Sequence, residues 1–177
     1  MQTDLRDGDR IPMLWDDYLQ LPDGVSGEFI DGCLVVSPSP TQRHQIICGN
    51  LVATINRQLA CRVIQGWAWK PASDEFIPDV MAFDETDEQK RLTSTPHLAV
   101  EVLSTDRAAD LIRKFEKYAR AGLEHTWVVD PEALEIVVYR LGEDGVFHEM
   151  GRHGPGTVVT LPTAVGEVSL DPGSLLG

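Results

Sequence analysis

The apolar run Leu98–Leu103, interrupted by a single acidic residue, constrains the fold of this chain more than any other segment. Its length and its valine and leucine content are typical of a strand buried on both faces of a sheet. Glu101 lies inside this run, where an ionised and unpaired carboxylate costs several kcal/mol. We therefore expect a cation or a hydrogen-bond donor beside Glu101. Side-chain alternation along the strand predicts two faces, one with Ala99, Glu101 and Leu103 and the other with Leu98, Val100 and Val102.

A second acidic residue, Asp79, directly follows a proline and begins another apolar segment. Pro78 donates no backbone hydrogen bond and favours an extended conformation at Ile77. We therefore expect Asp79 where a strand is locally unpaired or close to a sheet edge. Mg²⁺ binds through one or two carboxylates together with phosphate oxygens of a substrate. Asp79 and Glu101 on neighbouring strands would provide such a site, with a turn aspartate and a structural salt bridge as the alternatives.

A helix predicted over Asp106–Ala121, with Gly122 as its end, supplies a candidate cation. Glu101 lies roughly 10 Å before the end of its strand, at about 3.3 Å per residue. If the helix folds back antiparallel, Lys114 lies about 12 Å along it, at about 1.5 Å per residue. The two displacements nearly cancel, so we expect the Lys114 ammonium level with Glu101. Asp110 is expected to pair with Lys114 at i,i+4 spacing, and a surface position is the alternative for Lys114.

The remaining pattern predicts helices and hairpins around these residues. Asp31-Gly32 between apolar runs predicts a hairpin whose first strand begins at Glu28. Thr41 caps a helix over Gln42–Ala60, with His44 in its first turn. We also expect a short helix over Leu14–Leu21 and a strand over Arg62–Lys70, with Trp67 and Trp69 in the core. An exposed loop is predicted over Asp84–Arg91, and a second hairpin is predicted from Thr126–Asp130 and Leu134–Tyr139. The helix that carries Lys114 has an apolar stripe of Ala108, Leu111, Phe115 and Tyr118.

Length and cysteine content narrow the class of protein. With 177 residues and no run of about 18 apolar residues, the chain is expected to be a single domain, 1–177, with a core of about 15–170 and no membrane contact. The polar N-terminus lacks the apolar core of a signal peptide, and an odd number of cysteines suits a reducing compartment. We therefore expect a cytoplasmic protein.

The net charge of -13 argues against general affinity for nucleic acid, because phosphate contacts come from Lys and Arg. The charge is unevenly distributed, however. The segment Arg107–Arg120 holds five basic and two acidic residues, hence +3, so the rest of the chain carries -16. This predicts a basic helix beside the candidate acids, with an ordinary solvated helix face as the alternative.

Several motifs occur together in one order along the chain: Glu28-Phe29-Ile30-Asp31-Gly32, Ser37-Pro38-Ser39-Pro40, His44, Pro78-Asp79, Glu101-Val102-Leu103-Ser104, Asp110, Lys114, Tyr118, Ala121-Gly122 and Trp127-Val128-Val129-Asp130. In this order and spacing the chain resembles the putative restriction endonuclease family of short bacterial proteins, within the PD-(D/E)XK nuclease superfamily. The resemblance covers roughly Trp15 to Leu170. It implies an α/β fold of the mixed α+β kind, with a restriction-endonuclease-like core in which helices flank a central mixed β-sheet, and an N-terminal β-hairpin.

The resemblance also implies roles for individual residues. Asp79 and Glu101 would hold a metal ion, Mg²⁺ with Mn²⁺ as a substitute, and Glu28 would supply an additional ligand or remain a hairpin-edge carboxylate. Lys114 would assist the attacking water. The superfamily usually places this lysine two residues after the second acid, where this chain has Leu103. Two further residues are candidates for supporting the site, without an assigned role: His44, for which a structural position in the first turn of its helix is the alternative, and Asp110.

The expected function is a metal-dependent DNA endonuclease that hydrolyses phosphodiester bonds with a metal-activated water. The alternative is a catalytically inactive nuclease-fold protein that binds nucleic acid or a protein partner. DNA is the expected substrate, while the sequence preference and the choice of DNA over RNA stay open. Cleavage of both strands by a fold with a single site favours a homodimer.

Overall fold

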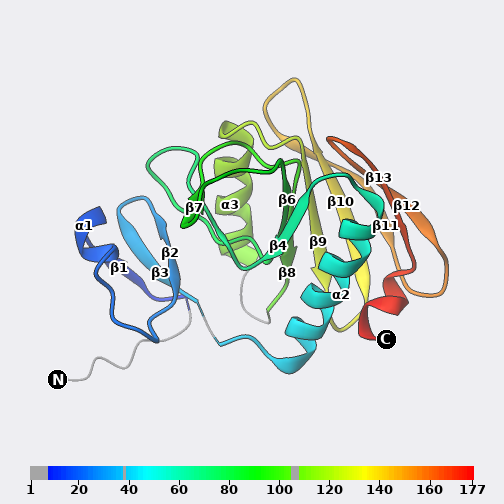
Figure 1. Ribbon diagram of the computed structural model, residues 1–177, viewed down its shortest axis with the longest axis horizontal. Coiled ribbons are helices and arrows are strands. Elements are labelled where there is room, and N and C mark those ends of the chain that lie inside the picture. Colours follow the sequence, from blue (N-terminus) through cyan, green and yellow to red (C-terminus); the bar gives the residue numbers. More distant parts are fainter. Residues whose placement is uncertain (1–7, 38, 105–107) are drawn as a thin grey trace.

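The structure, a computed structural model, describes residues 8–37, 39–104 and 108–177, and the side chains of residues 108–110 lie outside this description. Figure 1 shows a central sheet with a long helix on each side and a smaller sheet at the N-terminal end. The elements are β1 (Arg10–Pro12), α1 (Trp15–Tyr18), β2 (Gly27–Ile30), β3 (Cys33–Val36), α2 (Gln42–Gln58), β4 (Arg62–Gln65), β5 (Ala68–Trp69), β6 (Val80–Phe83), β7 (Arg91–Leu92), β8 (Leu98–Val102), α3 (Ala108–Arg120), β9 (His125–Asp130), β10 (Glu135–Leu141), β11 (Phe147–His153), β12 (Val159–Thr163), β13 (Gly166–Leu170) and the 3-10 helix η1 (Pro172–Leu176).

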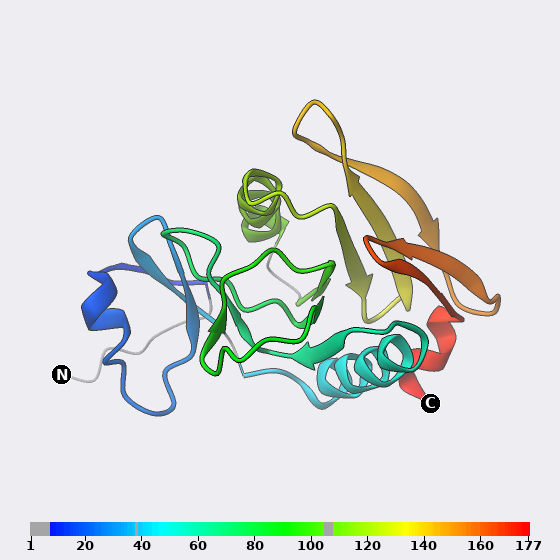
Figure 2. The same ribbon diagram turned by 45° about the horizontal axis from the view of Figure 1, so that its top comes forward.

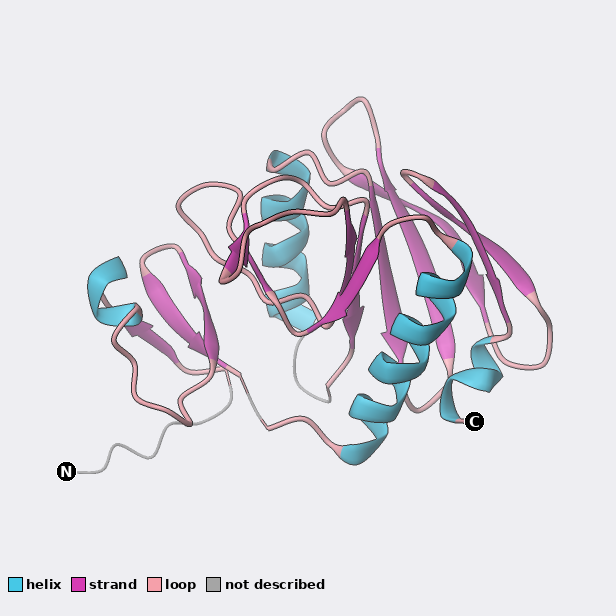
Figure 3. Cartoon of the chain, viewed as in Figure 1, coloured by secondary structure: helices cyan, strands magenta, loops and turns pink. Residues whose placement is uncertain are grey.

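Six strands form the central sheet, in the order β11-β10-β9-β8-β6-β4. β8 and β9 run parallel, whereas the other neighbouring pairs run antiparallel. The predicted mixed sheet with flanking helices is therefore present (Figure 3). β8 lies inside the sheet and all of its residues are buried, as the apolar sequence of this segment predicted.

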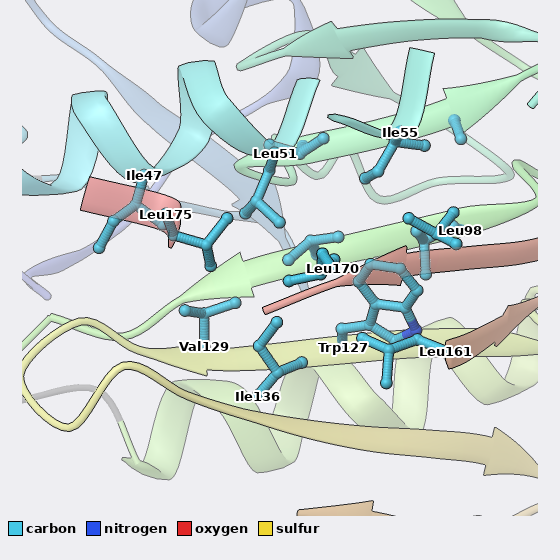
Figure 4. Close-up of a cluster of buried hydrophobic side chains, with 14 of the residues drawn as sticks. Ile47, Leu51, Ile55, Leu98, Trp127, Val129, Ile136, Leu161, Leu170 and Leu175 are labelled. Atoms are coloured by element: carbon cyan, nitrogen blue, oxygen red, sulfur yellow. The ribbon is translucent and has the colours of Figure 1, made fainter. Parts of the chain in front are cut away.

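α2 covers one face of the central sheet, and α3 covers the other (Figure 2). Thr41 caps α2 as predicted, because its hydroxyl accepts a hydrogen bond from the backbone amide of His44. The helix then repeats aliphatic residues at intervals of four, which places them on one side of it. Figure 4 shows three of them directed toward the strands: Ile47, Leu51 and Ile55.

The strand β8 divides its side chains between the two faces as its alternation predicted. On the α2 side, the core cluster includes Leu98, Val100 and Val102. Ala99 belongs to the second cluster, which also holds Tyr118 of α3. Glu101, two residues after Ala99, therefore points toward α3.

The N-terminal hairpin is joined to the core by a short backbone ladder. β2 and β3 form the predicted hairpin, with Asp31 (φ 52°) and Gly32 (φ 69°) in the left-handed conformation that its two-residue turn requires. Phe29 and Glu75 exchange two backbone hydrogen bonds of 2.9 and 2.8 Å. These bonds hold Glu28 of β2 against the core, where its side chain is buried.

The structure corrects the predicted strand Arg62–Lys70. Gly66 has a φ of 61°, which favours glycine, so the chain turns there and the segment divides into β4 and β5. β4 joins the central sheet, whereas β5 pairs in parallel with β7. Trp69 is fully buried and Trp67 packs against the same cluster, so the core interpretation of both is confirmed.

Other elements differ from prediction at their ends. α1 is shorter than the helix expected over Leu14–Leu21, and the second hairpin, β9 and β10, is longer than expected. α3 is followed by Gly122 with the predicted left-handed conformation (φ 77°), while the predicted helix start at Asp106 lies outside the described residues. Within the described ranges, no helix combines the length and the hydropathy needed to cross a membrane. The single-domain expectation stays a prediction.

The α2 side of the core gives a direct test of this packing. Leu51 is fully buried there, so Leu51→Ala is expected to lower the free energy of unfolding by about 2–5 kcal/mol, through lost burial and an unfilled cavity. Ile112→Ala, at an exposed position of α3, is the control, with an expected change below about 0.5 kcal/mol. Urea denaturation followed by circular dichroism measures both variants. Equal losses of unfolding free energy in the two variants would contradict the packing of Leu51 in the core.

Candidate active site

Asp79 and Glu101 lie on neighbouring strands at the same end of the sheet. β6 and β8 pair with Val80 opposite Val100, so Asp79, directly before β6, is level with Glu101. Oδ2 of Asp79 accepts a hydrogen bond from the backbone amide of Val102 at 2.7 Å. This bond ties the Asp79 carboxylate to the strand that carries Glu101. Antiparallel pairing of two short strands thus brings together two acids that are distant in the sequence.

Lys114 contacts the buried acids from α3. Its ammonium Nζ lies 2.8 Å from the carboxylate of Glu101 and 2.9 Å from Oε1 of Glu28. The three residues are only 5–7% exposed. Oε1 of Glu28 also accepts a 2.7 Å hydrogen bond from the backbone amide of Ile77. The contact between Lys114 and Glu101 expected from the sequence is present, and Glu28 is a second partner of the same ammonium.

Tyr118 is a site residue to which the sequence analysis assigned no role in the site. Its position in an apolar helix stripe predicts only a core role, yet its hydroxyl donates a 2.6 Å hydrogen bond to Oε1 of Glu101. Its ring packs against Trp69 and Phe76, which fixes its orientation. Burial and the carboxylate of Glu101 raise the pKa of Tyr118 well above its usual value, so the phenol keeps its proton. The available signal was the four-residue spacing from Lys114, which places both residues on one side of the helix.

His44 and Cys48 approach Asp79 from α2. Nε2 of His44 lies 3.1 Å from Oδ1 of Asp79, and Sγ of Cys48 lies 3.6 Å from Nδ1 of His44. The structure therefore places His44 beside the site, as the sequence resemblance implied. Cys48 was not among the candidate site residues, because the spacing of the three cysteines in the sequence is not typical of a metal site. Among the described residues, these three side chains are the group of potential metal ligands whose atoms all lie within 4.8 Å of one another.

Glu28, Glu101 and Lys114 line one pocket. Ser104 follows β8 in the same pocket, and its hydroxyl is buried without a hydrogen-bond partner among the described residues. A buried polar atom without a partner is costly, and it marks a place for water or a ligand. A ligand in this pocket would meet two carboxylates, an ammonium and a free hydroxyl. The remaining lining residues are Val35, Ser37, Val102, Leu103 and Leu111.

Two carboxylates contact one lysine in this region, and the charge of a third, Asp79, acts on the same group. Burial raises the pKa of Glu101 to about 7, Lys114 opposes this rise, and the charges of Asp79 and Glu28 add to it. Burial by itself lowers the pKa of Lys114, but Glu101 and Glu28 outweigh it and raise that pKa above its usual value. The single ammonium therefore stays charged while the acids compete for it. Oxygen ligands with excess negative charge fit a divalent cation of the Mg²⁺ type.

Two lysines of the predicted basic helix α3 are neutralised by acidic partners. Lys114 contacts two glutamates, and Lys117 pairs with both Asp31 and Asp74. The pairing expected between Asp110 and Lys114 involves a side chain outside the described residues. The charge count along α3 therefore overestimates its free positive charge, because the neutralising acids come from distant segments.

Comparison with known proteins relates this geometry to a family. A family model, Uma2, described as a putative restriction endonuclease, matches residues 15–173. The chain belongs to the Uma2 family. A crystal structure of a putative nuclease belonging to DUF820, from Anabaena variabilis ATCC 29413, has a similar fold, with a TM-score of 0.75, 20% sequence identity, and coverage of 93% of this chain and 98% of that one. Among curated proteins, none matches the chain. The predicted family and fold class are confirmed.

In this Uma2 chain, the lysine near the acids comes from a helix and not from the strand of the second acid. Leu103, two residues after Glu101, lines the pocket with an apolar side chain. Lys114 reaches the same glutamate from α3. The roles of Asp79, Glu101, Glu28 and Lys114 in metal binding and catalysis stay predictions.

Removing the Lys114 ammonium tests the charge balance of the Uma2 site. Lys114→Met leaves Glu28 and Glu101 buried without their cation, so it is expected to lower the free energy of unfolding by about 3–5 kcal/mol. Adding Glu101→Gln is expected to recover part of this loss, since one unpaired charge is removed. Lys90→Met, at an exposed loop position, is the control and should change stability by less than about 0.5 kcal/mol. Chemical denaturation gives all three values, and a Lys114→Met loss as small as the control would contradict the buried pairing.

Proposed function

We propose that this Uma2 protein is a divalent-metal-dependent DNA endonuclease that hydrolyses phosphodiester bonds, with Asp79, Glu101 and Lys114 at its centre. The observation that carries the proposal is the imbalance of charge in the pocket region. Glu28 of β2 and Glu101 of β8 contact the buried Lys114, and Asp79, at the start of β6, is level with Glu101 on the neighbouring strand. Such a cluster of acids is stabilised by an additional cation, and a cation held beside the pocket can act on a phosphate.

Asp79 and Glu101 are the proposed ligands of Mg²⁺, for which Mn²⁺ can substitute. Both supply carboxylate oxygens from adjacent backbone segments, which suits the oxygen preference of Mg²⁺. Glu28 is the proposed supporting ligand, because one hydrogen bond from the backbone amide of Ile77 fixes its carboxylate beside the ammonium that it shares with Glu101. When bound, the ion supplies a more acidic water and offsets the negative charge that develops on the phosphoryl group.

Lys114 is the proposed charge-stabilising residue. Its ammonium is a compact point charge with three donors, which suits phosphate oxygens and an attacking water. Glu28 and Glu101 hold this ammonium in the pocket, and Tyr118 fixes the orientation of Glu101. A lysine already ordered at the pocket loses little side-chain freedom when a substrate arrives. A DNA phosphate is the proposed group that it meets there.

A second candidate function is a catalytically inactive nuclease fold that binds nucleic acid or a protein. The ion pairs of Lys114 and Lys117 and the net charge of -13 favour this candidate, because these two lysines are already bound to carboxylates and the chain as a whole repels duplex phosphates. A homodimer would place two single-site subunits on opposite strands and is the proposed assembly of the active form.

Plasmid nicking separates the two candidates. The wild type is expected to nick supercoiled DNA with Mg²⁺ or Mn²⁺ and to lose this activity in excess chelator. Asp79→Asn, Glu101→Gln and Lys114→Met are each expected to lower the rate by on the order of 100-fold or more. Glu167→Gln, on an exposed strand position, is the matched acid control with wild-type activity expected.

The same variants define the results that would contradict the proposed nuclease function. Nicking that persists in Glu101→Gln and Lys114→Met would exclude this centre. An inactive wild type that still retards DNA in a gel would favour the binding function. Calorimetric titration of Mg²⁺ into wild type and Asp79→Asn checks the ligand assignment without requiring any turnover.

A further inference from the structure

A second set of ligands, of softer chemical character, lies on the α2 side of Asp79. We propose that His44, Cys48 and Asp79 form a binding site for a zinc-class cation, and that this site shares Asp79 with the proposed Mg²⁺ site. The binding itself does not depend on nuclease activity. Only its consequence for Mg²⁺ binding rests on the proposed function.

The fold brings these ligands together through one turn of helix and one strand end. His44 and Cys48 are four residues apart on α2, so they share a helix face, which is the ligand spacing of helical zinc sites. Thr41 fixes the start of the helix by capping the His44 amide at 3.2 Å. Asp79 faces them from the start of β6, where the amide of Val102 holds its other oxygen. Each ligand is therefore held by backbone structure.

The distances are close to those of a four-coordinate zinc ion. Zn–N and Zn–O bonds of about 2.0–2.2 Å and Zn–S bonds of about 2.3 Å place tetrahedral ligand atoms roughly 3.3–3.7 Å apart. Nε2 of His44 lies 3.1 Å from Oδ1 of Asp79, whereas Sγ of Cys48 lies 3.6 Å from the other ring nitrogen, Nδ1. With one atom taken from each residue, the three ligand atoms all lie within 4.8 Å of one another. An ion binds one of the two nitrogens, so the His44 ring has to turn to bring that nitrogen toward both of the other ligands. Solvent or a substrate oxygen supplies the fourth ligand.

The ligand types select the class of cation. A thiolate and an imidazole are poor ligands for Mg²⁺, which prefers oxygen, and good ligands for Zn²⁺ and its spectroscopic substitutes Co²⁺ and Cd²⁺. Burial raises the pKa of Cys48 to about 12, so without a metal the thiol keeps its proton. Metal binding replaces that proton by a sulfur–metal bond and releases the proton to the solvent, with no change in oxidation state.

The ion can reach the site from the His44 and Asp79 side. The side chains of His44 and Asp79 are 17% and 25% exposed, whereas Cys48 is fully buried beneath them. Zinc at this site takes Asp79 away from Mg²⁺, so the two ions are expected to compete. Cys33 and Cys61 are half-buried and free of disulfides, and they provide matched controls in the same chain.

Absorption spectroscopy with Co²⁺ and Cd²⁺ tests the thiolate ligand directly, using the full chain. One equivalent of either ion is expected to produce a sulfur-to-metal charge-transfer band in the wild type and in Cys61→Ser. Cys48→Ser is expected to lose the band, and His44→Ala is expected to weaken Co²⁺ binding by at least about tenfold. A wild type without the band, or a Cys48→Ser variant that retains it, would overturn the proposal.

A measurement on the wild type alone covers the case in which Cys48→Ser fails to fold. Calorimetric titration of Zn²⁺ in buffers of different ionisation enthalpy is expected to show release of about one proton per ion from the thiol. Zinc binding without proton release would overturn the thiolate assignment. If the wild type nicks DNA, Zn²⁺ at a concentration that saturates the site is expected to inhibit the nicking, and added Mg²⁺ is expected to relieve this inhibition. Nicking that Zn²⁺ does not diminish would overturn the proposed competition between Zn²⁺ and Mg²⁺. A wild type without nicking activity would count against the proposed nuclease function, and the spectroscopic test of the zinc site would still stand.

Discussion

The buried contact of one ammonium with two carboxylates, Lys114 with Glu101 and Glu28, is the interaction on which the rest of this structure depends. It joins α3, the central strand β8 and the N-terminal strand β2, which are distant in the sequence. Desolvation offsets most of the attraction in such pairs, so an apolar cluster would hold these elements at least as well. A buried ionic group that adds little net stability is better explained by binding or chemistry. This is the physical reason for seeking the function of the Uma2 chain here and not in the larger apolar core under α2.

Local patterns predicted the parts of the site that depend on backbone geometry within one connected segment. The alternation of β8 put Glu101 on the α3 side, and the rise per residue of strand and helix put Lys114 level with it. Only a short connection lies between them, so few arrangements are open to the chain. The hairpin at Asp31-Gly32 was predictable for the same reason. The turn at Gly66 was not predictable, because a left-handed glycine between Gln65 and Trp67 leaves the apparent strand pattern of Arg62–Lys70 intact.

Contacts that depend on docking between distant segments could not be derived from the sequence. Glu28 reaches Lys114 because the backbone of Phe29 pairs with that of Glu75, and no local signal specifies this pairing. The periodicity of α3 predicts a core position for Tyr118, because its ring lies in the core and only its hydroxyl takes part in the site. The sum of charges on α3 likewise omits the acids that neutralise Lys117 from elsewhere. Sequence patterns assign residues to faces, whereas the partners on those faces follow from the packing.

Asp79 is the residue at which the two proposed cation sites meet, and its two oxygens have different surroundings. Oδ2 accepts the amide of Val102 and so follows the strand that carries Glu101, while Oδ1 lies toward His44. An ion on either side changes the charge that the other side experiences, because charges a few ångströms apart in a partly buried site are weakly screened. Affinity for divalent ions of the first transition row generally exceeds that for Mg²⁺ wherever nitrogen or sulfur is available. Asp79 has an imidazole and a thiol on one side and carboxylates on the other. The type of cation that is available, and not only its concentration, therefore determines which set of ligands the Asp79 carboxylate joins.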